Sequence, residues 1–202
     1  NLADKANRRG RFMLALSALA FSLSASLSAH AGVHYVAAHY TYYNELKYPA
    51  RAIVGTYCEG SGCKCEATYS NDGGPEKKMK RLTEEWGVVI SYKGSDITIP
   101  SHQNLRVNMK FSNQDTTACY IYFITQENES FYTGARLITP DGGWRRAYVR
   151  PSLSNYADGS SCLNASPDHE DAINDYNLNK ELTAQYNIYE GSDANPELCP
   201  MH

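Results

Sequence analysis

The sequence predicts a mainly β fold, an antiparallel β-sandwich or barrel of about eight strands with one short helix and a disulfide-stapled polar tail. Three observations support this prediction. Residues 105–111, LRVNMKF, alternate apolar and polar side chains, which is the period of a half-buried strand. Short polar loops separate this segment from the next alternating segments, as in an antiparallel meander. The 16 tyrosines of the chain suit pleated surfaces.

The elements follow one another along the chain in a simple order. Strands are expected at 33–43, 51–57, 64–69, 105–111 and in the segments ACYIYFIT, SFYTGARLIT and WRRAYVR, with a hairpin at 88–99 that turns at 93–96. A short helix is expected from Glu76 to Trp86, because Pro75 precedes it and Gly87 follows it. A second helix is expected near residues 169–186.

Residues 1–31 have the pattern of a secretory signal. Arg8, Arg9 and Arg11 precede an uncharged run rich in alanine, leucine and serine, at residues 12–28. This run of 17 residues is shorter than the roughly 20 strongly apolar residues of a spanning helix, so we expect no permanent membrane span.

The cleavage position decides which residue starts the mature chain. Cleavage after Ala31 follows small residues at 29 and 31 and exposes Gly32, whereas cleavage after Ala29 exposes His30. The alternative to cleavage is a retained apolar helix that packs in an extracellular fibre.

We therefore divide the chain into a signal segment at 1–31, a β domain at 32–150 and an acidic extension of that domain at 151–202. The extension carries nine acidic residues and one basic residue, and the whole chain has a net charge of −3. Nonspecific nucleic-acid binding needs many phosphate-neutralising cations, so we expect no nucleic-acid partner.

All of the cysteines follow the signal segment. The six are Cys58, Cys63, Cys65, Cys119, Cys162 and Cys199. An even number behind a signal predicts up to three disulfides in a secreted or periplasmic protein. Cys63 and Cys65 are too poorly placed to bond each other, so the cluster is expected to anchor distant segments. The rival interpretation is a zinc site, but no CxxC pair occurs.

The strand pattern also predicts a candidate binding face. If Leu105, Val107, Ile121 and Phe123 face the core, aromatic and cationic side chains alternate with them on the other face. The candidate binding residues on that face are Tyr120, Tyr122, Tyr132, Arg136, Trp144, Arg146 and Tyr148, with Arg150 on the same strand as the last three. Sugar rings stack on such aromatics, and guanidinium groups pair with carboxylate or sulfate.

Two alternatives to ligand binding use the same residues. Cross-strand tyrosine and arginine pairs stabilise a solvent-facing sheet without any ligand. The acidic extension could also fold over this basic face and neutralise its charge internally.

The histidines suggest a second function. If His30 were the first residue, its amine and imidazole, together with His102, could hold Cu(II) in a set of nitrogen ligands. This set resembles the histidine brace of the lytic polysaccharide monooxygenases, which are secreted β-sandwich enzymes. The resemblance implies copper-dependent oxidation of a polysaccharide. The alternative is that all six histidines are ordinary surface or core residues.

The sequence thus predicts a secreted or periplasmic, disulfide-stabilised β domain that binds a glycan or an extracellular protein through the Tyr/Trp/Arg face. We expect no catalysis, no cofactor and no bound metal. The copper enzyme is the first alternative. The second is a self-assembling fibre subunit that retains its apolar helix.

Overall fold

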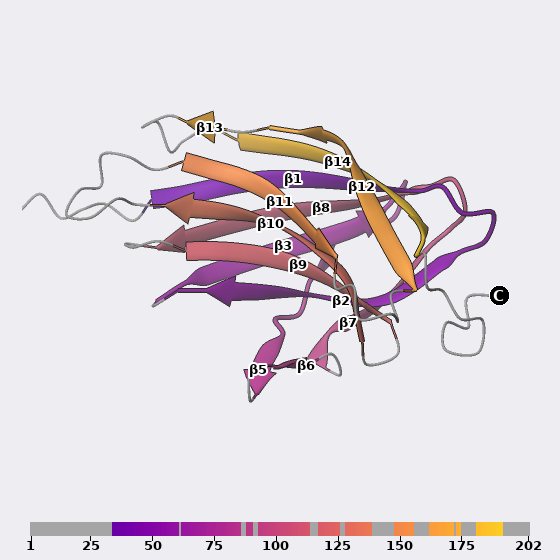
Figure 1. Cartoon of the computed structure of the whole chain (residues 1–202), viewed down its shortest axis with the longest axis horizontal. Helices are drawn as coiled ribbons and strands as arrows, with labels where there is room; N and C mark the ends of the chain where they lie inside the picture. The colour runs from indigo at the N-terminus through magenta and orange to yellow at the C-terminus, as the bar shows by residue number, and fades with distance from the viewer. Residues whose placement is uncertain are drawn as a thin grey trace, which may run out of the picture. The chain divides into compact units, whose positions relative to one another are not determined.

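Two six-stranded sheets and a two-stranded ribbon form the fold seen in the computed structural model (Figure 1). The structure describes residues 34–60, 62–85, 88–90, 93–113, 117–125, 128–138, 148–155, 162–171, 173–174 and 181–191. The strands are β1 (His34–Asn44), β2 (Ala50–Glu59), β3 (Lys64–Asn71), β4 (Lys77–Lys78), β5 (Thr83–Glu85), β6 (Val88–Ile90), β7 (Ser95–Ile99), β8 (Asn104–Asn113), β9 (Thr117–Thr125), β10 (Asn128–Ile138), β11 (Tyr148–Asn155), β12 (Leu163–Glu170), β13 (Ile173–Asn174) and β14 (Glu181–Glu190). The fold is therefore mainly β, as expected, and the expected signal segment lies outside the described residues.

The first sheet has the order β12-β14-β1-β8-β3-β4. Its β1 runs antiparallel to β8 and parallel to β14. The helix expected at 169–186 is wrong where the structure describes those residues, because Glu181–Glu190 is a strand. Alternate residues of that strand, Leu182, Ala184, Tyr186 and Ile188, are buried in the core. Burial of one strand face decides the conformation of this segment.

The second sheet has the order β13-β11-β10-β9-β2-β7. Its centre is the antiparallel set β2, β9 and β10. The hairpin expected at 88–99 is wrong, because β7 pairs with β2 while β6 pairs with β5. β5 and β6 form a small ribbon of their own at the bottom of Figure 1.

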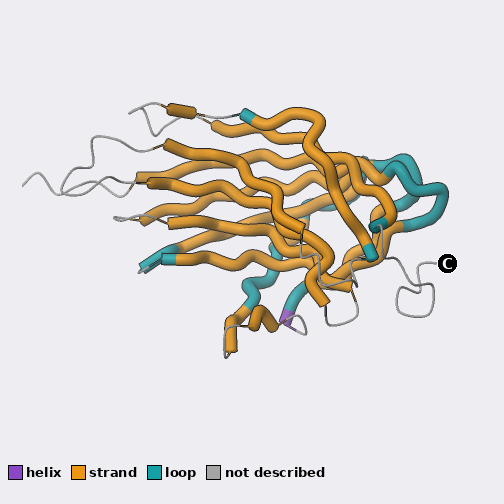
Figure 2. Tube along the Cα trace, viewed as in Figure 1, coloured by secondary structure: helices purple, strands orange, loops and turns teal. Residues whose placement is uncertain are grey.

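The helix expected at 76–86 is also wrong for its described part, which contains β4 and β5. Helical conformation among the described residues is confined to Lys93, in 3-10 form (Figure 2). The backbone of Met79 donates to Ala67 O at 2.8 Å, and that of Leu82 donates to Thr56 O at 2.7 Å. Neighbouring strands thus use the backbone groups that a helix would need for itself.

The main core lies between the inner faces of the two sheets. Leu105, Val107, Ile121 and Phe123, which the sequence assigns to the core, are each completely buried. They join a single cluster drawn from both sheets. Phe123 stacks on Phe131 with ring centroids 4.4 Å apart, and the hydroxyl of Tyr42 in β1 hydrogen-bonds Thr133 in β10.

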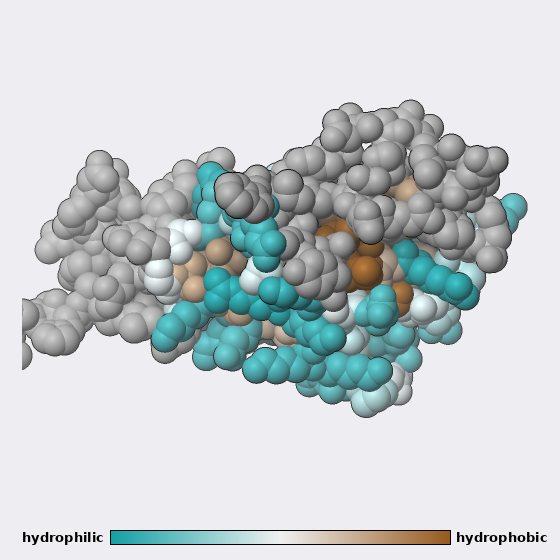
Figure 3. Space-filling model, turned by 90° about the horizontal axis from the view of Figure 1, so that it is seen from below, coloured by the Kyte–Doolittle hydropathy of each residue, from teal (hydrophilic) through white to brown (hydrophobic). Residues whose placement is uncertain are grey.

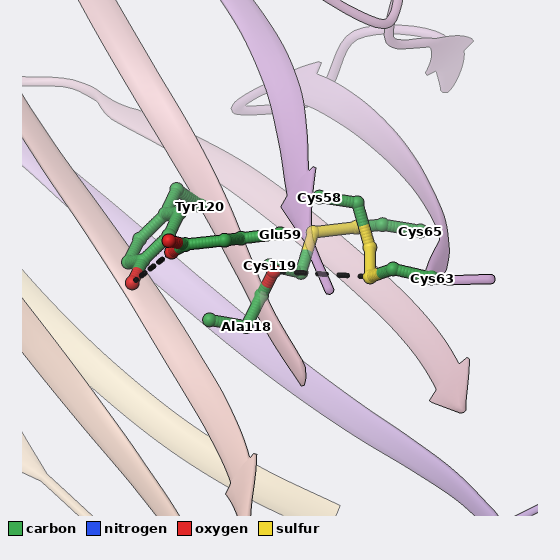
Figure 4. The surroundings of a disulfide bond; sticks show 7 residues. All are labelled: Cys58, Glu59, Cys63, Cys65, Ala118, Cys119 and Tyr120. Atoms are coloured by element: carbon green, nitrogen blue, oxygen red, sulfur yellow. Dashed lines mark hydrogen bonds between the residues drawn. A yellow bond between two sulfur atoms is a disulfide. The ribbon is translucent and has the colours of Figure 1, made fainter. Parts of the chain in front are cut away.

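The four cysteines of two neighbouring disulfides belong to this core (Figure 4). Cys65 of β3 bonds Cys119 of β9 and so joins the two sheets, whereas Cys58 bonds Cys63 across a short loop. Cys63 and Cys65 do not bond each other, as expected, although the Cys58–Cys63 bond is local rather than distant. Cys162 is disulfide-bonded too, and Cys199 lies outside the described residues.

The described residues include no helix with the length and apolar character needed to cross a membrane. The two disulfides are compatible with an extracellular or periplasmic protein.

Candidate binding surface

The outer face of the second sheet carries four tyrosines on three adjacent strands, which we call the tyrosine face: Tyr57 in β2, Tyr120 and Tyr122 in β9, and Tyr132 in β10. The register pairs Tyr57 with Tyr120 and Tyr122 with Tyr132. Side chains directly opposite on one face lie close enough to touch. The alternation of Ile121 and Phe123 into the core therefore determines which rings meet on the outside.

Glycines lie directly opposite two of these tyrosines. Gly55 is the partner of Tyr122 on one side, and Gly134 is the partner of Tyr120. The Tyr120 ring lies over Gly134, since a Cβ at that position would come within 2.5 Å of Tyr120 Cδ1. A larger residue at 134 would push this ring off the sheet.

The tyrosines form a continuous cluster of rings. Tyr132 lies with its centroid 5.0 Å from that of Tyr122 and 5.2 Å from that of Tyr120. Tyr120 and Tyr122 are only 8% and 5% exposed, because Leu82, Ala118 and Ile124 join them in a second apolar cluster. Neither ring is open for sugar stacking. Among the candidate binding residues whose burial is described, half-buried Tyr132 and exposed Arg136 are the ones that solvent reaches.

Hydrogen bonds hold the polar ends of this face. Arg136 Nη2 donates to the Tyr120 hydroxyl at 3.2 Å, and that hydroxyl donates to Glu59 Oε2 at 3.2 Å (Figure 4). Burial raises the pKa of Tyr120, against an opposing effect of Arg136. Tyr57 donates to Glu84, and this bond to a carboxylate, aided by burial, raises the pKa of Tyr57 to about 12. Both phenols therefore stay neutral at physiological pH.

The remaining candidates are less completely described. Trp144 and Arg146 lie outside the described residues. Tyr148 starts β11, where its backbone pairs with Ile138 and Asn174.

The register places two arginines directly opposite each other. Arg136 of β10 is the cross-strand partner of Arg150 of β11. Side chains at directly opposed positions of an antiparallel pair lie on the same face of the sheet. On that face Arg136 also contacts the Tyr120 hydroxyl, which donates to Glu59.

Four described carboxylates of the acidic extension make contacts away from the tyrosine face. Glu170 accepts a hydrogen bond from Tyr186 at 2.6 Å, and Glu190 accepts one from Tyr48 at 2.8 Å. Glu181 lies 3.4 Å from His39, and Asp171 lies 2.8 Å from His169. All of these contacts are on strands of the first sheet or on the loops that follow them.

The described histidines are dispersed. His102 has a positive φ of 58° in the loop before β8, and its Nδ1 lies 3.3 Å from the hydroxyl of Tyr43. His39 Nδ1 lies 2.7 Å from Asn108 Oδ1 on the first sheet. Within the described part of the chain, no group of three histidine, cysteine or carboxylate side chains could hold a metal ion.

Sequence reasoning found Tyr120, Tyr122 and Tyr132, but it missed Tyr57 and the residues that cover these rings. Leu82 was assigned to a helix, and Gly55 and Gly134 carried no role. A glycine opposite an aromatic residue in a strand pattern is the signal that marks such a close approach. Comparison with protein-family models, curated proteins and solved structures found no match for this chain.

Proposed function

We propose that this protein is a secreted or periplasmic β domain that binds an acidic glycan without catalysis, through the sheet face that carries Tyr132, Arg136 and Arg150. The pairing of Arg136 with Arg150 is the observation that carries the proposal. Arginines at directly opposed positions of two strands are close enough for one carboxylate or sulfate to accept hydrogen bonds from both. The half-buried Tyr132 ring beside them offers a surface on which a sugar ring stacks.

The ring cluster behind this surface supports the proposal. Tyr120 and Tyr122 are fixed by burial, and Tyr120 holds Arg136 through its hydroxyl. A preorganised arginine loses less conformational entropy on binding than a free one. Two sheets packed as a β-sandwich and stapled by disulfides would hold this face rigid.

The copper alternative requires His30 as the first residue of the mature chain and His102 as the second histidine ligand. His30 lies outside the described residues. The described His102 places its Nδ1 3.3 Å from the hydroxyl of Tyr43.

The proposal is tested by direct binding. The exported protein is titrated with uronic-acid oligosaccharides and, for comparison, with neutral oligosaccharides of the same length. We expect binding of the acidic set, with roughly tenfold weaker affinity for Arg136→Ala and for Arg150→Ala. Arg51→Ala, which removes an exposed arginine of β2 paired with Thr98, is the matched control and should bind as the parent does. Equal affinity of all four proteins would overturn the proposal.

A further inference from the structure

A groove of about 640 Å³ is lined by residues of β2 and β3, by the segment 78–81 and by Lys93. Its cationic side chains are Lys64, Lys78, Lys80, Arg81 and Lys93, and Glu66 is the acidic residue among its lining. We call this the basic groove. It shares no residue with the surface of Tyr132, Arg136 and Arg150, so the inference below does not depend on the proposed function.

The segment from Lys78 to Leu82 fixes the cations of the groove in place. Lys78 pairs with Thr68 at the edge of the first sheet, and Thr56 of the second sheet donates its backbone N–H to Lys80 O at 3.0 Å. The segment therefore bridges the two sheets in an extended conformation. Its apolar residues, Met79 and Leu82, are buried in the two apolar clusters.

This anchoring forces the intervening cations outward. Lys78, Lys80 and Arg81 are exposed, on either side of buried Met79. Buried Cys65, whose disulfide joins the sheets, also lines the groove and stiffens it. A rigid backbone presents these charges at fixed spacing, in contrast to a mobile loop.

The groove has excess positive charge. Within the described residues, Lys64, Lys78, Lys80 and Arg81 form no salt bridge. The five cations of the lining outnumber its one carboxylate, Glu66, so the cations repel one another, and a multivalent anion offsets that repulsion. The described atoms are mainly hydrophilic when the molecule is viewed from the side of β5 and β6 (Figure 3).

The lining indicates the kind of anion. A second depression of about 410 Å³ shares Glu66 and Lys78 with the groove and continues past Lys110 and His39. Two adjoining depressions favour a linear polymer over a small ion. None of the described lining residues is aromatic, so the groove lacks the stacking platforms of single-stranded nucleic-acid sites. Lysines are compact point charges that suit spaced sulfate groups.

We propose that the basic groove binds a sulfated polysaccharide. Each sulfate would accept hydrogen bonds from ammonium or guanidinium groups of Lys64 and the 78–81 segment, and the chain of sugars would continue into the adjoining depression. A nucleic acid is the competing polyanion, and the experiment separates the two.

The test uses the full exported protein with heparin as the probe, by titration at several salt concentrations. The groove variant is Lys78→Gln/Arg81→Gln. The matched control is Lys47→Gln/Arg51→Gln, which removes the same two charge types from exposed positions outside the groove. We expect the groove variant to bind heparin roughly tenfold more weakly, with a shallower salt dependence, and the control to bind as the parent does.

Several outcomes overturn the inference: equal losses in both double variants, unchanged binding to chemically desulfated heparin, or tighter binding of a single-stranded oligonucleotide than of heparin. Thermal unfolding of each variant guards against a folding defect. Arg136→Ala is measured in parallel, because loss of heparin binding there alone would assign the anion to the tyrosine face and not to the groove.

Discussion

The side chain of Leu82 covers Gly55, so that a Cβ on Gly55 would lie 2.4 Å from Leu82 Cγ. Leu82 follows the cationic segment 78–81, and it completes the cluster that buries Tyr120 and Tyr122. Leu82 therefore connects the apolar cluster of the tyrosine face to the cationic segment that lines the basic groove.

This contact predicts non-additive stability changes. Gly55→Ala should destabilise the protein by about 1 to 3 kcal/mol, because the branched end of Leu82 must move away from the sheet. Leu82→Ala alone should cost about 2 to 5 kcal/mol through lost burial. In the double variant the added methyl enters vacated space, so its cost should fall to near zero. Urea unfolding of the four proteins gives the coupling, and strict additivity would show that the contact carries no energy.

The two described disulfides should differ in their contribution to stability. The Cys65–Cys119 bond closes a separation of 54 residues, whereas the Cys58–Cys63 bond closes one of 5. Loop-closure entropy then predicts losses of about 4 and about 2 kcal/mol when each pair is replaced by alanine. Chemical denaturation of the two double variants measures this difference. A larger loss for the short loop would mean that packing around Cys58 outweighs chain entropy.

Two neighbouring core tyrosines should respond oppositely to loss of their hydroxyl groups. Tyr40 is 1% exposed, and its hydroxyl has no hydrogen-bond partner among the described residues. Tyr42 hydrogen-bonds Thr133. Tyr40→Phe should therefore stabilise the protein by about 1 kcal/mol, and Tyr42→Phe should destabilise it by about 1 to 2 kcal/mol. The free energy of unfolding is the measurement. Destabilisation by Tyr40→Phe would indicate that its hydroxyl is satisfied.

Alkaline pH should unfold the protein. Burial raises the pKa of Tyr42, and the Glu84 hydrogen bond raises that of Tyr57 to about 12. In the unfolded chain these phenols lose their protons near pH ~10. The unfolded state then binds fewer protons than the folded state, so stability is complete below about pH 10 and falls as pH rises toward 12 and beyond.

Urea unfolding at several pH values, with tyrosinate absorbance on the same samples, tests this. Tyr57→Phe should lessen the fall between pH ~10 and ~12. A single normal titration of all tyrosines without loss of structure would contradict the prediction.

The alternation of side chains was enough to place the core strands. Val107 and Ile121 are buried as their positions in the period-two pattern require, because a strand next to a core must point every second side chain inward. The same pattern placed Arg136 on the outside. These assignments depend only on local strand geometry, and a single sequence is enough to show the alternation.

The errors share a different cause. Residues 76–86 contain acidic and basic residues at helical spacing, and 181–186 has no β-rich composition, yet both regions contribute strands. Their backbone groups bond to residues outside the local segment: Leu82 N–H donates to Thr56 O, and Thr183 O accepts a hydrogen bond from Asp171 N–H. Local propensity is weak compared with such pairing and with burial of one face.

The sequence by itself determined the β class, the inward set of core residues and the face on which Tyr132 and Arg136 lie, since each follows from period-two alternation. Tertiary structure alone decided that Leu82 buries Tyr120 and Tyr122, that Arg136 meets Arg150, and that Lys64 meets the cations of 78–81 around one groove. These contacts join residues from different strands. The order of the strands depends on the free energy of the whole core, which no single segment of the sequence reveals.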